Sequence, residues 1–214
     1  LDRVIPYIDM PIQHIDNTML KRMGRRLGEE GTRDLFSRMR ERIPSLVLRT
    51  TFIVGFPGET KEQFEKLVDF VQETGLERVG VFPWSAEEGT PAEKLPDRVP
   101  EQEQQRRVEE LMLVQQEVAF SWNRSRLGSE VDVLIDSVCQ ETGSLLGRSY
   151  AEAPEIDSTI RIPAGSGQVG EMVPCRITET DDYDLIAELT GNLQSIEQTE
   201  GGEVDPRIIA EGKR

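Results

Sequence analysis

The sequence lacks most of the residues from which a self-contained catalytic or metal centre is built. Its 214 residues include one histidine, His14, and two cysteines, Cys139 and Cys175. With a single histidine and no Ser-His-Asp or Cys-His pattern, hydrolase chemistry has little support. The cysteines stand 36 positions apart in different predicted strands, so they form no metal-ligand spacing and are predicted to be small core residues. Their scarcity fits a reducing, cytoplasmic environment.

Long apolar stretches are also missing. No run of about 18 apolar residues occurs, so the sequence predicts no membrane-spanning helix. The chain begins with Leu-Asp-Arg-Val-Ile-Pro, which is strand-like and not a signal peptide, and it begins without Met. We therefore expect a fragment of a longer protein. Hydrophobic residues make up 36% of the chain, which predicts a folded protein, with disorder expected only over 201–214.

Positive charge is scarce in the second half of the chain. The net charge is −15, and from Gly128 to Glu200 there are 15 Asp and Glu against three Arg and no Lys, a net of −12. Such a segment repels phosphate and attracts a basic partner. An acidic surface that only confers solubility is the simpler explanation for one domain taken alone.

The feature around which the chain is organised is the stretch from Leu48 to Thr60. Its first half has the apolar and β-branched composition of a strand, and it breaks at Gly55, Pro57 and Gly58. Thr60 and Gln63 then form a predicted capping box, which starts a helix. Free backbone N–H groups thus gather at the carboxyl end of a strand, where α/β proteins bind ligands. A simple tight turn explains the same glycines equally well.

The first 84 residues predict a parallel sheet. A proline-interrupted strand over 3–12 ends in Gln13 and His14, and two further strands are predicted over 47–54 and 78–84. Helices are predicted after Asp16 or Asn17, over 32–43 and over 61–75. The βαβ order implies an α/β fold with right-handed crossovers, although three strands are too few for a closed barrel. Arg22, Arg25 and Arg26 form a basic cluster that could contact an anionic ligand, or could be a solvated helix end.

The remaining residues predict a linker, a long helix and a small β-module. Residues 85–100 are rich in proline and charge, and a helix of about 27 residues, about 40 Å long, follows to about Leu127. From Ser129 the hydrophobic period changes to two, which predicts five short strands over 131–136, 145–150, 159–162, 172–177 and 184–189. These strands describe a small antiparallel barrel or a sandwich.

Four motifs in this order closely resemble those of the radical-SAM methylthiotransferases, enzymes that use S-adenosylmethionine. They are YIDMPIQH (7–14), LKRMGRR (20–26), RTTFIVGFPGET (49–60) and EGTPA (88–92). The segment GRSYAEAPEID (147–157) resembles the TRAM domain of the RimO branch of this family. The resemblance covers nearly the whole chain and implies the C-terminal half of a partial TIM-like barrel over 1–96. A linker with a connecting helix over 97–127, a TRAM domain over 128–200 and a tail over 201–214 complete the implied organisation.

The resemblance also implies two [4Fe-4S] clusters in the full-length protein, whose ligand cysteines are absent from this chain. The implied mechanism is reductive cleavage of S-adenosylmethionine to a 5′-deoxyadenosyl radical, hydrogen abstraction and sulfur insertion, with the cofactors doing the chemistry. No catalytic side chain is identifiable, and the fragment alone is expected to be inactive. By position in the family, the predicted cofactor-binding residues are Gln13, His14, Arg49, Thr51, Ile53, Gly55, Pro57, Phe82 and Trp84.

The RimO branch modifies the β-carbon of an aspartate in ribosomal protein S-twelve, so the resemblance implies that basic protein as the partner. The predicted contacts lie in the TRAM-like segment at Tyr150, Glu152, Glu155 and Asp157. A tRNA-modifying enzyme of the MiaB branch is the nearest alternative, but a module with a charge of −12 would bind RNA poorly. A third hypothesis is that the isolated fragment is a non-catalytic acidic module that binds a basic protein.

Overall fold

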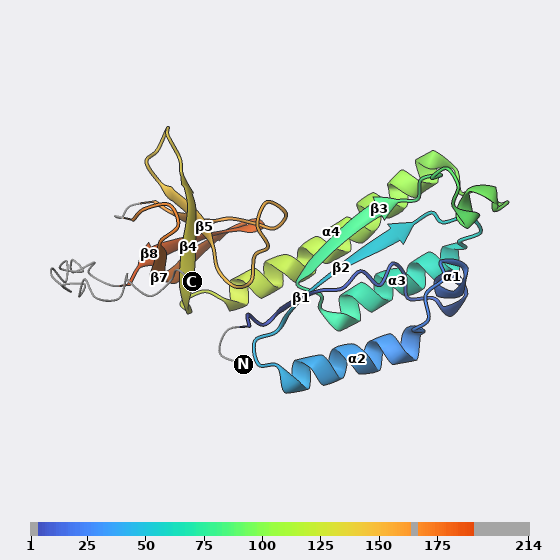
Figure 1. Cartoon of the computed structure of the whole chain (residues 1–214), viewed down its shortest axis with the longest axis horizontal. Helices are drawn as coiled ribbons and strands as arrows, with labels where there is room; N and C mark the ends of the chain where they lie inside the picture. The colour runs from blue at the N-terminus through green and yellow to red at the C-terminus, as the bar shows by residue number, and fades with distance from the viewer. Residues whose placement is uncertain (1–3, 164–166, 191–214) are drawn as a thin grey trace, which may run out of the picture.

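The alternation of strands and helices in the first 84 residues produces a parallel sheet, as predicted. The computed structural model describes residues 4–163 and 167–190 (Figure 1). Strands β1 (Tyr7–Asp9), β2 (Val47–Val54) and β3 (Arg78–Pro83) form the sheet in the order β1-β2-β3, with both pairs parallel. Its helices are α1 (Asn17–Arg22), α2 (Glu29–Arg42) and α3 (Lys61–Thr74).

The first strand is shorter than the predicted range 3–12. Regular pairing ends at Asp9, and Pro11, which has no N–H to donate, follows. The chain then rejoins the sheet at Gln13, whose N–H donates to the carbonyl of Thr51 and whose carbonyl accepts from Ile53, each at 2.9 Å. The interruption thus leaves Gln13 beside β2, near the carboxyl end of the sheet.

The second strand presents different side chains to its two faces because strand residues alternate. Leu48, Phe52 and Val54 are buried in the core with Phe64 and Phe70 of α3. Arg49, Thr51 and Ile53 lie on the opposite, partly exposed face. That face is the one available to a ligand.

The helix boundaries follow local capping. The predicted capping box at α3 is confirmed: Thr60 Oγ1 accepts from the Gln63 N–H, and Gln63 Oε1 accepts from the Thr60 N–H. Helix α2 begins at Glu29, three residues before the predicted start, because Asn17 Oδ1 accepts the Glu29 N–H at 2.9 Å.

A 25-residue helix, α4 (Glu101–Ser125), connects the sheet to the second unit and lies along β3 (Figure 1). It contributes the fully buried Leu111 to the core of the sheet. A short 3₁₀ helix, η1 (Pro91–Lys94), precedes it. No helix in the described parts of the chain is long and apolar enough to cross a membrane.

The second unit is a closed five-stranded barrel. Of the two predicted alternatives, the barrel is therefore confirmed and the sandwich is not. Its strands are β4 (Glu130–Val138), β5 (Leu145–Arg148), β6 (Ile160–Ile162), β7 (Met172–Asp181) and β8 (Asp184–Leu189). They follow the order β4-β5-β6-β8-β7, and β7 pairs back onto β4. Four of the pairs are antiparallel, whereas β6 and β8 run parallel. The predicted α/β fold followed by a small β-domain is thus confirmed. The β-domain differs from the antiparallel prediction in one strand pair, β6 with β8, which is parallel.

Three details of the barrel differ from the prediction. Strand β7 continues past Ile177 to Asp181, because its second half pairs with β8. Strand β5 ends at Arg148, where the Glu152 carboxylate accepts the Ser149 N–H. Cys175 is buried as predicted, but Cys139 is half-buried and begins the turn after β4. The expected disordered tail, 201–214, lies outside the described residues, and the domain boundaries at 96, 127 and 200 stay predictions.

Buried ion pairs join the two units on the side of the amino ends of the strands. Glu152 of the barrel binds Arg78 of β3 at 3.1 Å and Arg126, just past α4, at 2.6 Å. Both guanidinium groups lie about 5 Å from the centre of the Trp122 ring. The barrel is therefore fixed at the end of the sheet opposite the carboxyl ends of its strands.

Candidate functional site

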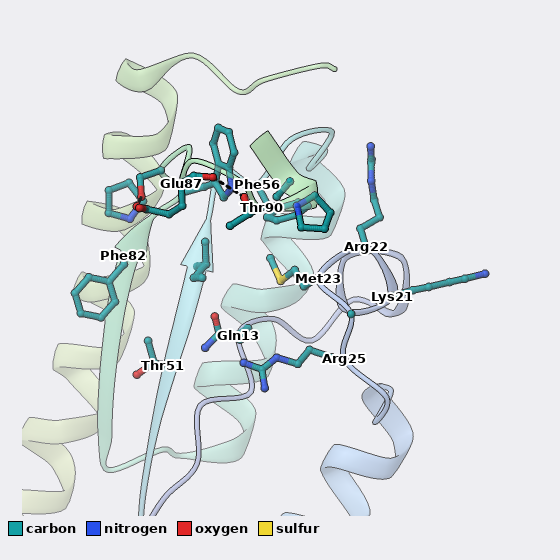
Figure 2. A pocket seen from close by; sticks show the side chains of 17 residues that line it. Gln13, Lys21, Arg22, Met23, Arg25, Thr51, Phe56, Phe82, Glu87 and Thr90 are labelled. Carbon is teal, nitrogen blue, oxygen red and sulfur yellow. Dashed lines mark hydrogen bonds between the residues drawn. The ribbon is translucent and has the colours of Figure 1, made fainter. Parts of the chain in front are cut away.

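A cleft opens at the carboxyl ends of the strands. Its volume is about 750 Å³, within the range of small-molecule sites (Figure 2). Residues from β2, β3, the α1 region and the segment 83–92 surround it. Its lining includes Gln13, Lys21, Arg22, Met23, Arg25, Thr51, Ile53, Phe56, Phe82, Trp84 and Glu87.

One wall of the cleft is apolar and aromatic. Phe56 and Trp84 meet edge to face, with ring centres 6.2 Å apart, and Ile53 lies on the strand beside them. The Arg98 guanidinium lies 5.5 Å from the centre of the Trp84 ring. Phe82 is 56% exposed although it is a large apolar side chain. Such a wall suits a flat, weakly polar group.

Two uncharged polar side chains lie at the base of the cleft. Gln13 and Thr51 lie near each other there (Figure 2). Gln13 has a φ of 75°, which is uncommon for a residue with a side chain, and it is held by its two backbone hydrogen bonds to β2. An amide and a hydroxyl can donate to and accept from ligand hydroxyl groups.

A buried carboxylate supports the glycine-rich turn behind this wall. The Glu59 carboxylate accepts the N–H groups of Gly55 and Phe56 and lies 3.3 Å from the Arg107 guanidinium of α4. Its other oxygen lies 3.4 Å from Nε2 of His14. Nδ1 of His14 accepts the N–H groups of Ile15 and Asp16, which assigns the ring proton to Nε2. Glu59, His14 and Arg107 thus support the turn and do not themselves line the cleft.

Comparisons with known proteins give the same two units. Residues 1–71 match the radical SAM superfamily, and residues 127–190 match the TRAM domain. The ribosomal protein uS12 methylthiotransferases RimO of Syntrophotalea carbinolica and Geotalea uraniireducens are 51% and 47% identical to the chain over 88% of its length. That of Geobacter sulfurreducens is 48% identical over 87%. The chain spans 42% of the length of each of these relatives.

The chain is similar to the RimO-type radical-SAM methylthiotransferases over most of its length. Its radical-SAM segment is followed by a TRAM domain, as its motifs predicted. The comparison with solved structures found coproporphyrinogen III oxidase (HemN) from Escherichia coli, a radical SAM enzyme. The match covers 81% of this chain and 41% of the HemN chain. The TM-score is 0.46 and the sequence identity is 17%.

The cleft brings together five of the residues that the RimO-type resemblance nominated for the cofactor. They are Gln13, Thr51, Ile53, Phe82 and Trp84. Their roles stay predictions, but their meeting at one opening follows from the parallel register of β2 and β3, which pairs Thr51 with Gly80 and Ile53 with Phe82.

The other four nominated residues lie outside the residues that line the cleft. His14 is fully buried, with both ring nitrogens engaged as above. Arg49 binds Asp9 at 2.8 Å and lies 3.5 Å from Asp157 of the TRAM domain. Gly55 and Pro57 are buried in the turn, and a Cβ on Gly55 would lie 2.3 Å from the Gln104 side chain of α4. These residues shape the surroundings of the cleft.

Of the four residues nominated for partner contacts, two make contacts within this chain instead. Glu152 is 4% exposed and is paired with two arginines of this chain. Asp157 accepts a hydrogen bond from the Tyr7 hydroxyl at 2.6 Å. Both therefore join the TRAM domain to the radical-SAM segment. Tyr150 is half-buried and Glu155 is exposed, so a partner contact stays a prediction for these two.

Several lining residues were not nominated from the sequence. Lys21 lines the cleft without having been singled out, together with Arg22 and Arg25 of the basic cluster, for which a solvated helix end was the preferred explanation. Arg26 of that cluster is not among the lining residues.

Phe56 and Met23 also face the cleft. The position of Phe56 after Gly55 in the predicted turn was a usable signal, because a turn rarely carries a large apolar side chain without a contact for it.

Proposed function

We propose that this chain supplies the adenosyl-binding cleft and the TRAM domain of an enzyme that transfers a methylthio group to ribosomal protein uS12, at the β-carbon of an aspartyl residue. The cleft at the carboxyl ends of β1, β2 and β3 carries the proposal. Relatives that bear the uS12 methylthiotransferase name, at 45–51% identity, support the reaction and the acceptor. Because the chain covers 42% of their length, the activity belongs to the longer protein.

The residues of the cleft fit the adenosyl group of S-adenosylmethionine. Ile53, Phe56 and Trp84 offer a contact surface for an adenine ring, and Gln13 and Thr51 offer hydrogen-bonding partners for ribose hydroxyls. When bound, S-adenosylmethionine supplies the reactive adenosyl group. The residues of this chain bind and orient it and keep water from the apolar side.

The residues do not fit an iron–sulfur cluster. A [4Fe-4S] cluster is held by thiolates, and the chain has only Cys139 and Cys175, both in the TRAM domain. The parts of the chain that the structure describes hold no group of three or more His, Cys, Asp or Glu side chains suited to a metal. The two clusters of the full-length enzyme would therefore be bound by residues outside this chain.

The proposed partner is a basic protein. The TRAM domain is strongly acidic, and acidic side chains on it would attract a ribosomal protein and repel tRNA. Tyr150 and Glu155 are the proposed contacts of the domain. A pull-down in which tRNA binds at physiological salt and the ribosomal protein does not would contradict this assignment and favour the MiaB branch.

A titration of S-adenosylhomocysteine into the 214-residue chain tests the cleft. We expect saturable binding that weakens at least about fivefold in Trp84→Ala and in Gln13→Ala, because each removes a contact with the nucleoside. Leu113→Ala, an exposed apolar position on α4, is the control and should bind as the parent does. Equal affinity in all four proteins would contradict the proposed site.

Anaerobic reconstitution with iron and sulfide tests the assignment of the clusters. The chain is expected to bind no stoichiometric iron and to show no charge-transfer absorbance, since it offers no set of thiolate ligands. Stoichiometric iron with that absorbance would contradict the proposal that the cluster ligands lie elsewhere.

The isolated chain has a second candidate function, as a non-catalytic module that binds a basic protein. The acidity of the TRAM domain is the observation that favours it. Binding of the ribosomal protein together with no detectable binding of S-adenosylhomocysteine would select this function over the first.

A further inference from the structure

Three cationic side chains line the same side of the cleft. Lys21, Arg22 and Arg25 are exposed, and no ion pair or side-chain hydrogen bond engages any of them within the described residues. Several other cations of this chain are paired, as Arg33, Arg40 and Lys66 are with glutamates. The chain has 40 acidic residues against 25 basic ones, so partners are plentiful. The three unpaired cations therefore form a positively charged area on a protein whose net charge is negative.

The backbone fixes where these side chains begin. Helix α1 ends in a Schellman motif: the Gly24 N–H donates to the Lys21 carbonyl at 3.1 Å, and the Arg25 N–H donates to the Leu20 carbonyl at 2.8 Å. Gly24 has the φ of 71° that this motif requires. The chain reverses at that point, and Arg25 turns back toward Gln13 and Thr51 (Figure 2).

The other two cations extend in a different direction. Lys21 and Arg22 point outward from the opening, away from Gln13 and Thr51 (Figure 2). The Arg22 guanidinium rests against Gly58, where a Cβ would lie 2.2 Å from Nη1. Side chains that point outward lie away from a small molecule bound beside Gln13 and Thr51. They can meet a polypeptide that lies across the opening.

We propose that Lys21, Arg22 and Arg25 form a cationic rim that binds a carboxylate of the acceptor polypeptide as its modified segment enters the cleft. Arg25 meets the carboxylate nearest the base of the cleft, because a guanidinium pairs with a carboxylate through two parallel hydrogen bonds. This inference rests on the proposed function, since it assigns the acceptor to the opening that holds the adenosyl group.

The charges around the opening favour a single carboxylate over a nucleic acid. Glu87 lines the cleft as well, and the net charge of the chain is −15. A phosphodiester backbone brings one negative charge per nucleotide and would meet this acidic surface beyond the rim. An acidic side chain within a basic segment matches both the rim and the acidic TRAM domain.

A pair of fluorescent peptides tests the rim on the 214-residue chain. Both are short, lysine-rich synthetic peptides, one with a central aspartate and one with asparagine at that position. We expect the aspartate peptide to bind about three- to tenfold more tightly in fluorescence anisotropy, as for a partly exposed charge pair. Arg25→Gln should abolish the difference, and Arg25→Lys should restore part of it.

Arg42→Gln is the matched control, because Arg42 is an exposed arginine at the end of α2, away from the cleft. The control should retain the preference for aspartate. Equal binding of the two peptides by the parent chain would overturn the proposal, and so would loss of the preference in Arg42→Gln. Binding of a single-stranded RNA at physiological salt that Arg25→Gln abolishes would also overturn it, in favour of a nucleic acid.

The titration with S-adenosylhomocysteine separates this inference from the proposed function. A preference for aspartate in a chain that binds no nucleoside would retain the rim and contradict the cofactor site. Nucleoside binding without any preference for aspartate would do the reverse. If Arg25→Gln weakened nucleoside binding and left the peptide preference unchanged, the guanidinium would serve the cofactor and the proposal would be wrong.

Discussion

Two buried carboxylates hold together parts of this chain that are distant in sequence. Glu59 supports the turn behind the cleft, and Glu152 joins the TRAM domain to the sheet. Each forms an ion pair with an arginine that is distant in sequence. Glu59 pairs with Arg107, and Glu152 pairs with Arg78. Removal of one partner from such a buried pair leaves an uncompensated charge and typically costs about 3–5 kcal/mol.

The pH dependence of stability should report on Glu152. Burial alone would raise the pKa of this carboxyl group, but Arg126, Ser149 and Arg78 outweigh it and hold the pKa below the ordinary value of 4.5. The unfolded chain then binds the proton more readily than the folded chain. The stabilisation is complete above about pH 4.5 and is lost as the pH falls through the lower, folded-state value.

Urea unfolding of the parent and of Glu152→Gln between pH 7 and pH 3 measures this effect. We expect the variant to be about 3 kcal/mol less stable at pH 7 and to lose less stability on acidification. Other carboxylates with lowered pKa values, such as Glu29, are present in both proteins and cancel in the difference. Parallel stability curves for the two proteins would show that Glu152 has no such role.

At the residue scale, the sequence predicts positions along strands better than it predicts partners. Thr51, Ile53 and Phe82, which were nominated by position in the family that the chain resembles, line one cleft because the parallel register of β2 and β3 brings them together. Glu59 and Glu152 were not assigned structural roles, because their partners lie 48 and 74 residues away and no periodicity encodes such a pairing. Contacts of this kind appear only with the tertiary fold.

At the scale of elements, the end of α1 determines how the cleft opens. Gly24 adopts a φ of 71° with no atom within 4 Å of an added Cβ, so a side chain there would meet backbone strain alone. We predict that Gly24→Ala lowers the free energy of unfolding by about 1–2 kcal/mol. Chemical denaturation measures this change.

Gly75→Ala is the matched control for Gly24→Ala. Gly75 ends α3 with a φ of 60° and also has no neighbour within 4 Å of an added Cβ, but it lies away from the cleft. Both variants should be destabilised to a similar degree, and only Gly24→Ala should weaken the preference for the aspartate peptide. An equal loss of that preference in Gly75→Ala would show that general destabilisation causes it.

Element boundaries were predictable where a cap defines them and less so where pairing defines them. The capping box at Thr60 and the glycine at 75 bound α3 as expected. The parallel pairing of β6 with β8 was not predicted, because it depends on the long connection from β6 to β7 and not on the alternation within either strand. Strand β7 was longer than its apolar pattern because its second half pairs with β8.

For the whole molecule, the buried contacts between the sheet and the barrel predict coupled unfolding. Trp84 lines the cleft and Trp122 lies between Arg78 and Arg126, so the two tryptophans report on different regions. Single-tryptophan chains, with phenylalanine at the other position, should show coincident denaturation midpoints. In a Glu152→Ala background the two midpoints should separate, since the buried pairs that couple the units are lost. Separate midpoints in the parent background would contradict the coupling.

The length of α4 sets the distance between the two surfaces that an acceptor would use. At 25 residues the helix is about 37 Å long, and the barrel lies at its far end from the cleft. An extended segment of about 11 residues covers that distance. A basic partner held on the barrel would thus present its acceptor to the cleft at a high effective concentration, and shortening the tether between the two contacts below that span would abolish the gain.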